Sequence, residues 1–88
     1  MNTLASPLEI ANFAAPNRIV MPPLVIWQSG QDGIVTDAHR EHYRRSLGPG
    51  IVIVEATAVS PEGRLAATQL GLWDDAQIAG LADLATMI

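Results

Sequence analysis

The stretch IVIVE, residues 51–55, decides the fold: four β-branched residues in a row are closed by Glu55. Branched side chains favour extended backbone, and an apolar run without polar alternation is typical of a strand buried on both faces of a parallel sheet. A second such run, Ile19-Val20-Met21, ends at Pro22-Pro23, because proline has no N–H to donate to a ladder. We therefore predict two buried strands.

A helix is predicted between these strands. Thr36 is a good N-cap residue, and Asp37 lies where the helix dipole favours an anion. The helix should run to about Leu47, since Gly48-Pro49 is a stop signal. Tyr43 and Leu47 lie four residues apart and form its expected buried stripe.

A second helix is predicted after the second strand, and a hairpin before the first. Asp74 should cap the helix with Gln77 as its capping-box partner. Residues at helical spacing form its expected apolar face: Ile78, Leu81, Ala82 and Ala85. The hairpin is indicated by apolar residues that flank Ala11-Asn12, namely Leu8, Ile10 and Phe13.

The element order is thus hairpin, β, α, β, α, which implies an α/β fold with parallel strands. Two strands do not make a sheet that is covered on both faces, and a unit of this size buries only about 60% of its unfolded surface. We expect the chain to be a piece of a larger domain, or to complete its sheet with another chain. Its apolar strand faces then favour oligomers or aggregates, including a homo-oligomer.

Composition excludes several function classes. A net charge of −4 argues against a nucleic-acid partner, and the absence of cysteine excludes disulfides and thiolate metal sites. Residues 1–7 lack the features of a signal peptide, and the longest apolar stretch, residues 19–27, is about half of a membrane span. We therefore expect a cytoplasmic protein with no membrane partner.

Two long loops, residues 22–36 and 56–73, follow the carboxyl ends of the predicted strands. Connections in α/β units usually have about 2–6 residues, and function in these folds collects after the strand ends. We expect both loops to lie on the same side of the sheet, with Leu24 and Ala56 at the same end, and to face a ligand. Decorative insertion is the alternative reading.

Several residues suggest more specific sites. His39 and His42 are three apart on a helix, but neither has a carboxylate at metal-ligand spacing, so we predict that they are not metal ligands. Glu55 ends a strand, as the ribose-binding acid of a Rossmann domain does, but the first loop lacks the glycine motif of a nucleotide-binding half-domain. Trp27 follows a strand end, where pocket and packing roles are both open.

The motifs of the chain together resemble one family. They occur in order as NRIVMPPL (residues 17–24), DG-x-VT (32–36), HY (42–43), GIVIVEATAVSPEGR (50–64) and LGLWDD (70–75). This series resembles the N-terminal part of the old yellow enzyme family, the flavin-dependent ene reductases. The resemblance covers nearly the whole chain.

The resemblance implies a (β/α)8 TIM barrel, of which this chain forms the first β-α-β-α quarter after a short N-terminal hairpin. Residues 1–88 would be the incomplete N-terminal part of a single FMN-binding domain. The family uses FMN, with NAD(P)H as the reductant, and passes a hydride to small activated alkenes such as α,β-unsaturated carbonyls. This segment alone should be inactive. A non-catalytic, truncated or sheet-completing association module is the alternative.

The resemblance also implies residue roles. Pro22, Pro23, Leu24 and Val25 would lie against the flavin ring, largely through backbone, and Ala56 would approach the ring from the second strand. Trp27 lies where several relatives place a substrate-contacting tyrosine. Two departures follow: Val25 replaces a cysteine or threonine and donates no hydrogen bond, and Trp27 lacks a phenolic hydroxyl. The segment carries none of the family's catalytic residues.

Overall fold

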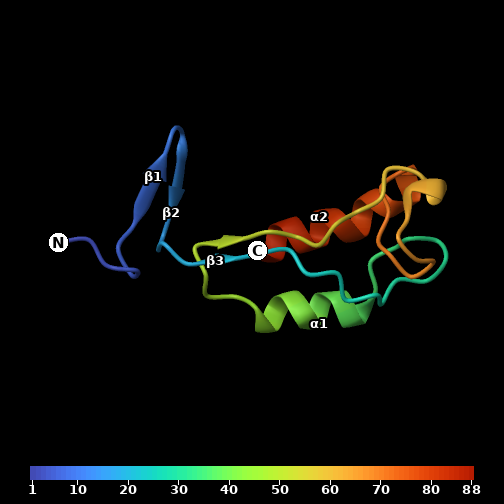
Figure 1. Ribbon diagram of the computed structural model, residues 1–88, viewed down its shortest axis with the longest axis horizontal. Coiled ribbons are helices and arrows are strands. Elements are labelled where there is room, and N and C mark those ends of the chain that lie inside the picture. The colour runs from blue at the N-terminus through green and yellow to red at the C-terminus, as the bar shows by residue number, and fades with distance from the viewer.

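The computed structural model describes residues 1–88. Its elements are β1 (Leu8–Ile10), β2 (Phe13–Ala15), β3 (Val20–Met21), α1 (Asp37–Arg45), β4 (Ile51–Val52), the short 3-10 helices η1 (Pro61–Gly63) and η2 (Asp75–Gln77), and α2 (Ile78–Met87). This order confirms the predicted hairpin followed by β, α, β, α. The hairpin stands at one end of the molecule, and the long loops gather at the other end (Figure 1). Neither helix is long and apolar enough to cross a membrane.

Strands β3 and β4 pair in parallel, with Val20 opposite Ile51 and Met21 opposite Val52. Both strands are shorter than the sequence predicts, because the ladder ends at the prolines. After Met21 accepts from the N–H of Ile53 at 3.1 Å, the next donor on β3 would be Pro23, which has no N–H. Residues 53 and 54 lie outside the strand.

The prediction that both strands are buried on both faces is wrong for this chain. Paired residues point to the same side, so one face carries Met21, Val52 and Val54, which pack against the hydrophobic core. The other face carries Val20 and Ile53, whose exposed fractions are 46% and 44%. The two helices contribute only to the core on the first face, and no element covers the second.

The core joins four segments: Val35 precedes α1, Tyr43 lies on α1, Leu70 lies in the second long loop, and Leu84 lies on α2. Tyr43 is fully buried, as predicted. Leu47 is exposed, contrary to prediction, because α1 ends at Arg45 with Ser46 as its C-cap. The chain turns away from the core before Leu47.

The start of the last helix confirms the predicted capping box of Asp74 and Gln77, although the first turn is the 3-10 helix η2. The predicted apolar face is mostly wrong: Ile78, Ala82 and Ala85 are exposed, and only Leu81 packs against the core. The buried positions are Gly80 and Leu84. A Cβ at position 80 would lie 2.6 Å from the Cβ of Val35, so glycine allows α2 to approach Val35 closely.

At the amino ends of the strands, Asn17 ties the hairpin to the short α1–β4 connection. Its Nδ2 donates to Gly48 O at 2.8 Å, and its Oδ1 accepts from Gly50 N at 2.7 Å. A Cβ at position 50 would lie 2.2 Å from the backbone oxygen of Asn17, so only glycine fits. This clamp fixes the end of the molecule opposite the long loops.

Candidate functional site

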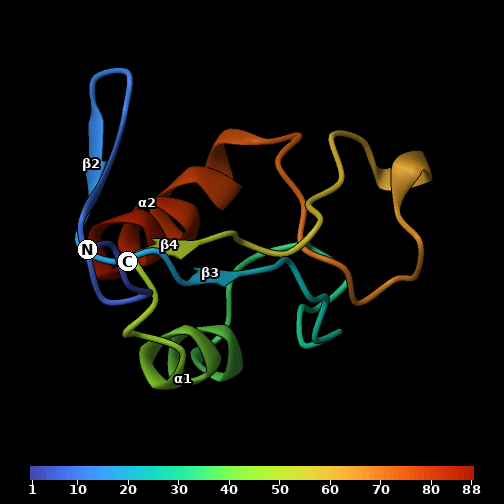
Figure 2. The same cartoon turned by 60° about the vertical axis from the view of Figure 1, so that its left-hand side comes forward.

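The two long loops lie at the same end of the strand pair, as predicted, and they bond to each other. Ser29 N donates to Thr68 O at 3.0 Å, and Gly71 N donates to Gly33 O at 3.0 Å. Figure 2 shows both loops beyond the tips of β3 and β4, away from the hairpin. Because parallel strands end together, the residues that follow them form one surface.

We call this the strand-end surface and define it as Pro22–Val25 and Ala56. Leu24 is 63% exposed, and Pro22, Pro23 and Ala56 are also exposed. The backbone N–H groups of Leu24, Val25 and Ala56 donate to no other residue of the chain. An apolar surface with free backbone donors and no charged side chain suits a flat, neutral heterocycle with polar edge atoms.

Trp27 lies one residue beyond this surface, after Ile26, and has a left-handed backbone, with a φ of 57°. Such a conformation is uncommon for a bulky residue and is maintained only where the surroundings fix it. Trp27 is 42% exposed, so packing in the core does not explain the conformation.

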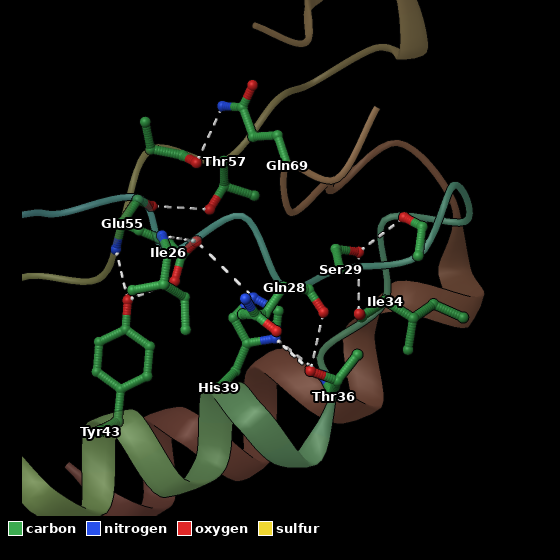
Figure 3. A network of polar contacts seen from close by, with 12 residues as sticks. Ile26, Gln28, Ser29, Ile34, Thr36, His39, Tyr43, Glu55, Thr57 and Gln69 are labelled. Atoms are coloured by element: carbon green, nitrogen blue, oxygen red, sulfur yellow. Dashed lines mark hydrogen bonds and ion pairs between the residues drawn. The ribbon is translucent and has the colours of Figure 1, made fainter. Parts of the chain in front are cut away.

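A buried polar cluster consists of Glu55, Tyr43 and His39 (Figure 3), and Glu55 directly precedes Ala56 of the strand-end surface. The hydroxyl of Tyr43 donates to Glu55 Oε1 at 3.0 Å and accepts from Glu55 N at 2.9 Å. His39 Nε2 lies 3.8 Å from Glu55 Oε2, and that same oxygen accepts from Ile26 N at 3.4 Å. The cluster joins α1, the end of the second strand and the first loop.

The sequence pattern does not predict this cluster. Glu55 was expected at a strand end and Tyr43 on a buried stripe, with no carboxylate near His39. Glu55 is distant in sequence, so residue spacing could not show the contact. The available signal was a charged residue that closes an apolar run, since such a group is buried only with partners.

Burial sets the protonation of the two aromatic members. Burial lowers the pKa of His39, and the nearby charge of Glu55 opposes that shift without cancelling it. The geometry agrees, because Nδ1 of His39 accepts from Thr36 N at 3.0 Å and so carries no proton. Burial also raises the pKa of Tyr43 to about 12. The cluster therefore has a neutral imidazole and a neutral phenol at neutral pH.

His42 does not join His39 in a site. Its ring packs edge-on against Tyr43, with ring centroids 4.9 Å apart, and its Nε2 is buried without a hydrogen-bond partner. No group of three or more metal-ligating side chains is present. That His39 and His42 bind no metal stays a prediction.

The largest cavity, of about 340 Å³, lies between the two long loops and η2. It is lined by Gln31, Asp32, Ile34, Pro61, Trp73, Asp74, Ala76 and Gln77. None of the residues of the strand-end surface lines it, so the two features are separate.

A parallel β-α-β-α unit whose long loops follow the carboxyl ends of its strands is an arrangement found in α/β enzymes. The profile of the NADH:flavin oxidoreductase / NADH oxidase family matches residues 3–88, and the chain belongs to this family. An NADPH dehydrogenase of Bacillus licheniformis is 44% identical over 97% of this chain. The chain spans only 26% of that relative.

Solved structures agree with this assignment. Morphinone reductase superposes with a TM-score of 0.87 at 30% identity, over 98% of this chain and 23% of that protein. The old yellow enzyme homologue of Zymomonas mobilis superposes with a TM-score of 0.87 at 32% identity, over 97% of this chain and 24% of its own. The chain is thus similar in structure to about a quarter of each oxidoreductase.

Proposed function

We propose that residues 1–88 form the first quarter of a TIM-barrel oxidoreductase of the ene reductase type, and that the strand-end surface binds the ring of FMN. The observation that carries the proposal is this surface itself. It combines exposed apolar side chains with three free backbone donors, at Leu24, Val25 and Ala56. The family match and the structural likeness to morphinone reductase support it.

The residues present fit part of the cofactor. A flavin ring is flat and apolar on its faces and has polar atoms at its edge, which matches backbone donors beside Pro22, Pro23 and Leu24. The surface has no arginine or lysine, so it does not supply the charge-assisted contacts that a phosphate needs. We infer that the chain holds the ring and that other parts of the barrel hold the phosphate.

When bound, FMN would supply hydride chemistry, from NAD(P)H to a small α,β-unsaturated carbonyl compound. The chain's own residues would orient the ring and exclude water from one side of it. Trp27, which follows the surface, would contact the substrate with an apolar ring and no hydroxyl. Val25 would pack against the ring without hydrogen bonding through its side chain.

A second candidate function is a sheet-completing association module. The uncovered strand face with Val20 and Ile53 favours it, because this face would be buried by another chain or by further strands.

A chimera tests the proposal. Residues 1–88 replace the matching quarter of the B. licheniformis NADPH dehydrogenase, and NADPH-dependent reduction of cyclohexenone is measured. We expect a yellow, active protein. In the same chimera, Ala56→Phe should remove flavin, because a large side chain would occupy the strand-end surface.

The matched control is Val59→Leu, a conservative change in the same loop at a side chain that is 81% exposed. This variant should keep flavin and activity. Equal flavin content in the Ala56→Phe and Val59→Leu chimeras would contradict the proposed ring site. A colourless chimera that is folded would favour the association module.

A further inference from the structure

We propose that Glu55 is a positioning residue: its buried carboxylate holds the backbone of Ile26 and thereby fixes Trp27 beside the strand-end surface. The importance of this role for catalysis rests on the proposed function. The positioning itself is a property of this chain.

Tyr43 holds the carboxylate of Glu55 in place. Glu55 is 2% exposed. The Tyr43 hydroxyl donates to Oε1 of Glu55 and accepts from the backbone N–H of Glu55. In a longer parallel ladder, this N–H would donate to the carbonyl oxygen of Pro23. The phenol takes the place of that strand partner at the point where pairing ends. The second oxygen, Oε2, then faces the first loop.

Oε2 is the link to that loop. It accepts from Ile26 N at 3.4 Å, a long hydrogen bond, and His39 Nε2 lies 3.8 Å away on the side of α1. Ile26 separates the strand-end surface from Trp27. Its two neighbours on the amino side, Leu24 and Val25, have no partner for their N–H groups, so this bond is the first anchor after the ladder ends.

The other side of Trp27 is anchored as well. The hydroxyl of Thr36 donates to Gln28 O at 3.1 Å, and Ser29 N donates to Thr68 O. Thr36 also bonds His39 through its backbone N–H, so α1 supports both anchors. Fixed on both sides, Trp27 keeps its left-handed backbone without being buried.

The test replaces the carboxylate by an amide of nearly the same shape, Glu55→Gln. The amide oxygen can serve Tyr43, but its NH2 group would then face the N–H of Ile26, donor against donor. Hydrogen exchange of the 88-residue chain is read at single residues by mass spectrometry. In a Trp73→Phe background, which leaves Trp27 as the single tryptophan, acrylamide quenching reports the exposure of the indole.

We expect Glu55→Gln to speed exchange of the Ile26 amide about tenfold, the order expected for loss of a hydrogen bond to a charged group, and to change Trp27 quenching. The control is Thr57→Val, which removes a hydrogen bond of 3.0 Å to the backbone oxygen of Glu55 but leaves the carboxylate intact. This variant should leave both readings unchanged. Equal effects of the two substitutions, or no effect of Glu55→Gln, would overturn the proposal.

If Glu55→Gln does not fold, hydrogen exchange of the unsubstituted chain tests the proposal. The Ile26 amide should exchange more slowly than those of Leu24 and Val25, which have no partners, and equal rates would overturn the proposal. These readings need no flavin. A chimera without flavin would therefore count against the proposed function and not against the role of Glu55.

Discussion

Tyr43 shows how one side chain can replace part of a sheet. Prolines at positions 22 and 23 end the ladder, and the backbone N–H of Glu55 is left without its strand partner in a buried place. An unpaired buried N–H costs about 1–3 kcal/mol, so a partner is required there. The phenol of Tyr43 supplies it and also donates to the carboxylate.

This environment predicts the titration of Tyr43, the chain's single tyrosine. Burial raises its pKa to about 12, so its stabilising effect is fully present below pH 10, the ordinary value, and is lost between pH 10 and about 12. The near-ultraviolet absorbance of tyrosinate measures this directly. The folded chain should titrate about two pH units above the urea-unfolded chain; coincident curves would mean that the phenol is not buried.

His39 predicts a pH dependence at the acid side. Its pKa in the folded chain is lowered because burial disfavours the imidazolium, so the unfolded chain binds the proton more readily. The free energy of unfolding should therefore fall as the pH drops below about 6.5. His39→Gln, whose oxygen can still accept from Thr36 N, should flatten this slope in urea unfolding measured from about pH 7 to about pH 5. An unchanged slope in the variant would refute the assignment to His39.

At the scale of elements, local signals predicted more than long-range ones. The N-cap Thr36, the capping box of Asp74 and Gln77, and the hairpin around Ala11-Asn12 follow from neighbours in sequence, and the structure confirms all three. The buried face of α2 does not follow from neighbours in sequence, because it depends on the contact between Gly80 and Val35. The cluster around Glu55 was missed for the same reason.

The capping box also has a long-range part. Gln77 is 1% exposed; its Oε1 accepts from Trp73 N and Asp74 N, and its Nε2 donates to Asp32 O at 2.8 Å. Gln77→Ala leaves buried groups without partners and should cost about 2–3 kcal/mol. Asp74→Ala loses the exposed bond from Ala76 N and should cost about 1 kcal/mol.

Urea unfolding of both variants checks this order, with the exposed neighbour Asp75→Ala as control. A larger loss for Asp74→Ala than for Gln77→Ala would mean that the contact between η2 and the first loop does not stabilise the fold.

For the whole molecule, the uncovered strand face and the uncharged strand-end surface both predict that the 88-residue chain does not work as an enzyme alone. The 88-residue chain should neither bind FMN tightly nor reduce cyclohexenone, because it lacks phosphate contacts and a means of holding a substrate in a reactive geometry. It should also associate through Val20 and Ile53. Flavin fluorescence, an NADPH-dependent assay and sedimentation measure these properties. A yellow, monomeric, active chain would contradict all three expectations.

We propose that the carboxyl ends of β3 and β4 hold a flavin ring when the barrel is complete. The ratio of flavin to protein tests it most directly, measured by visible absorbance for the purified chimera with the B. licheniformis dehydrogenase and for the chain alone. We expect stoichiometric flavin in the chimera and almost none in the chain alone. A folded chimera without flavin would contradict it.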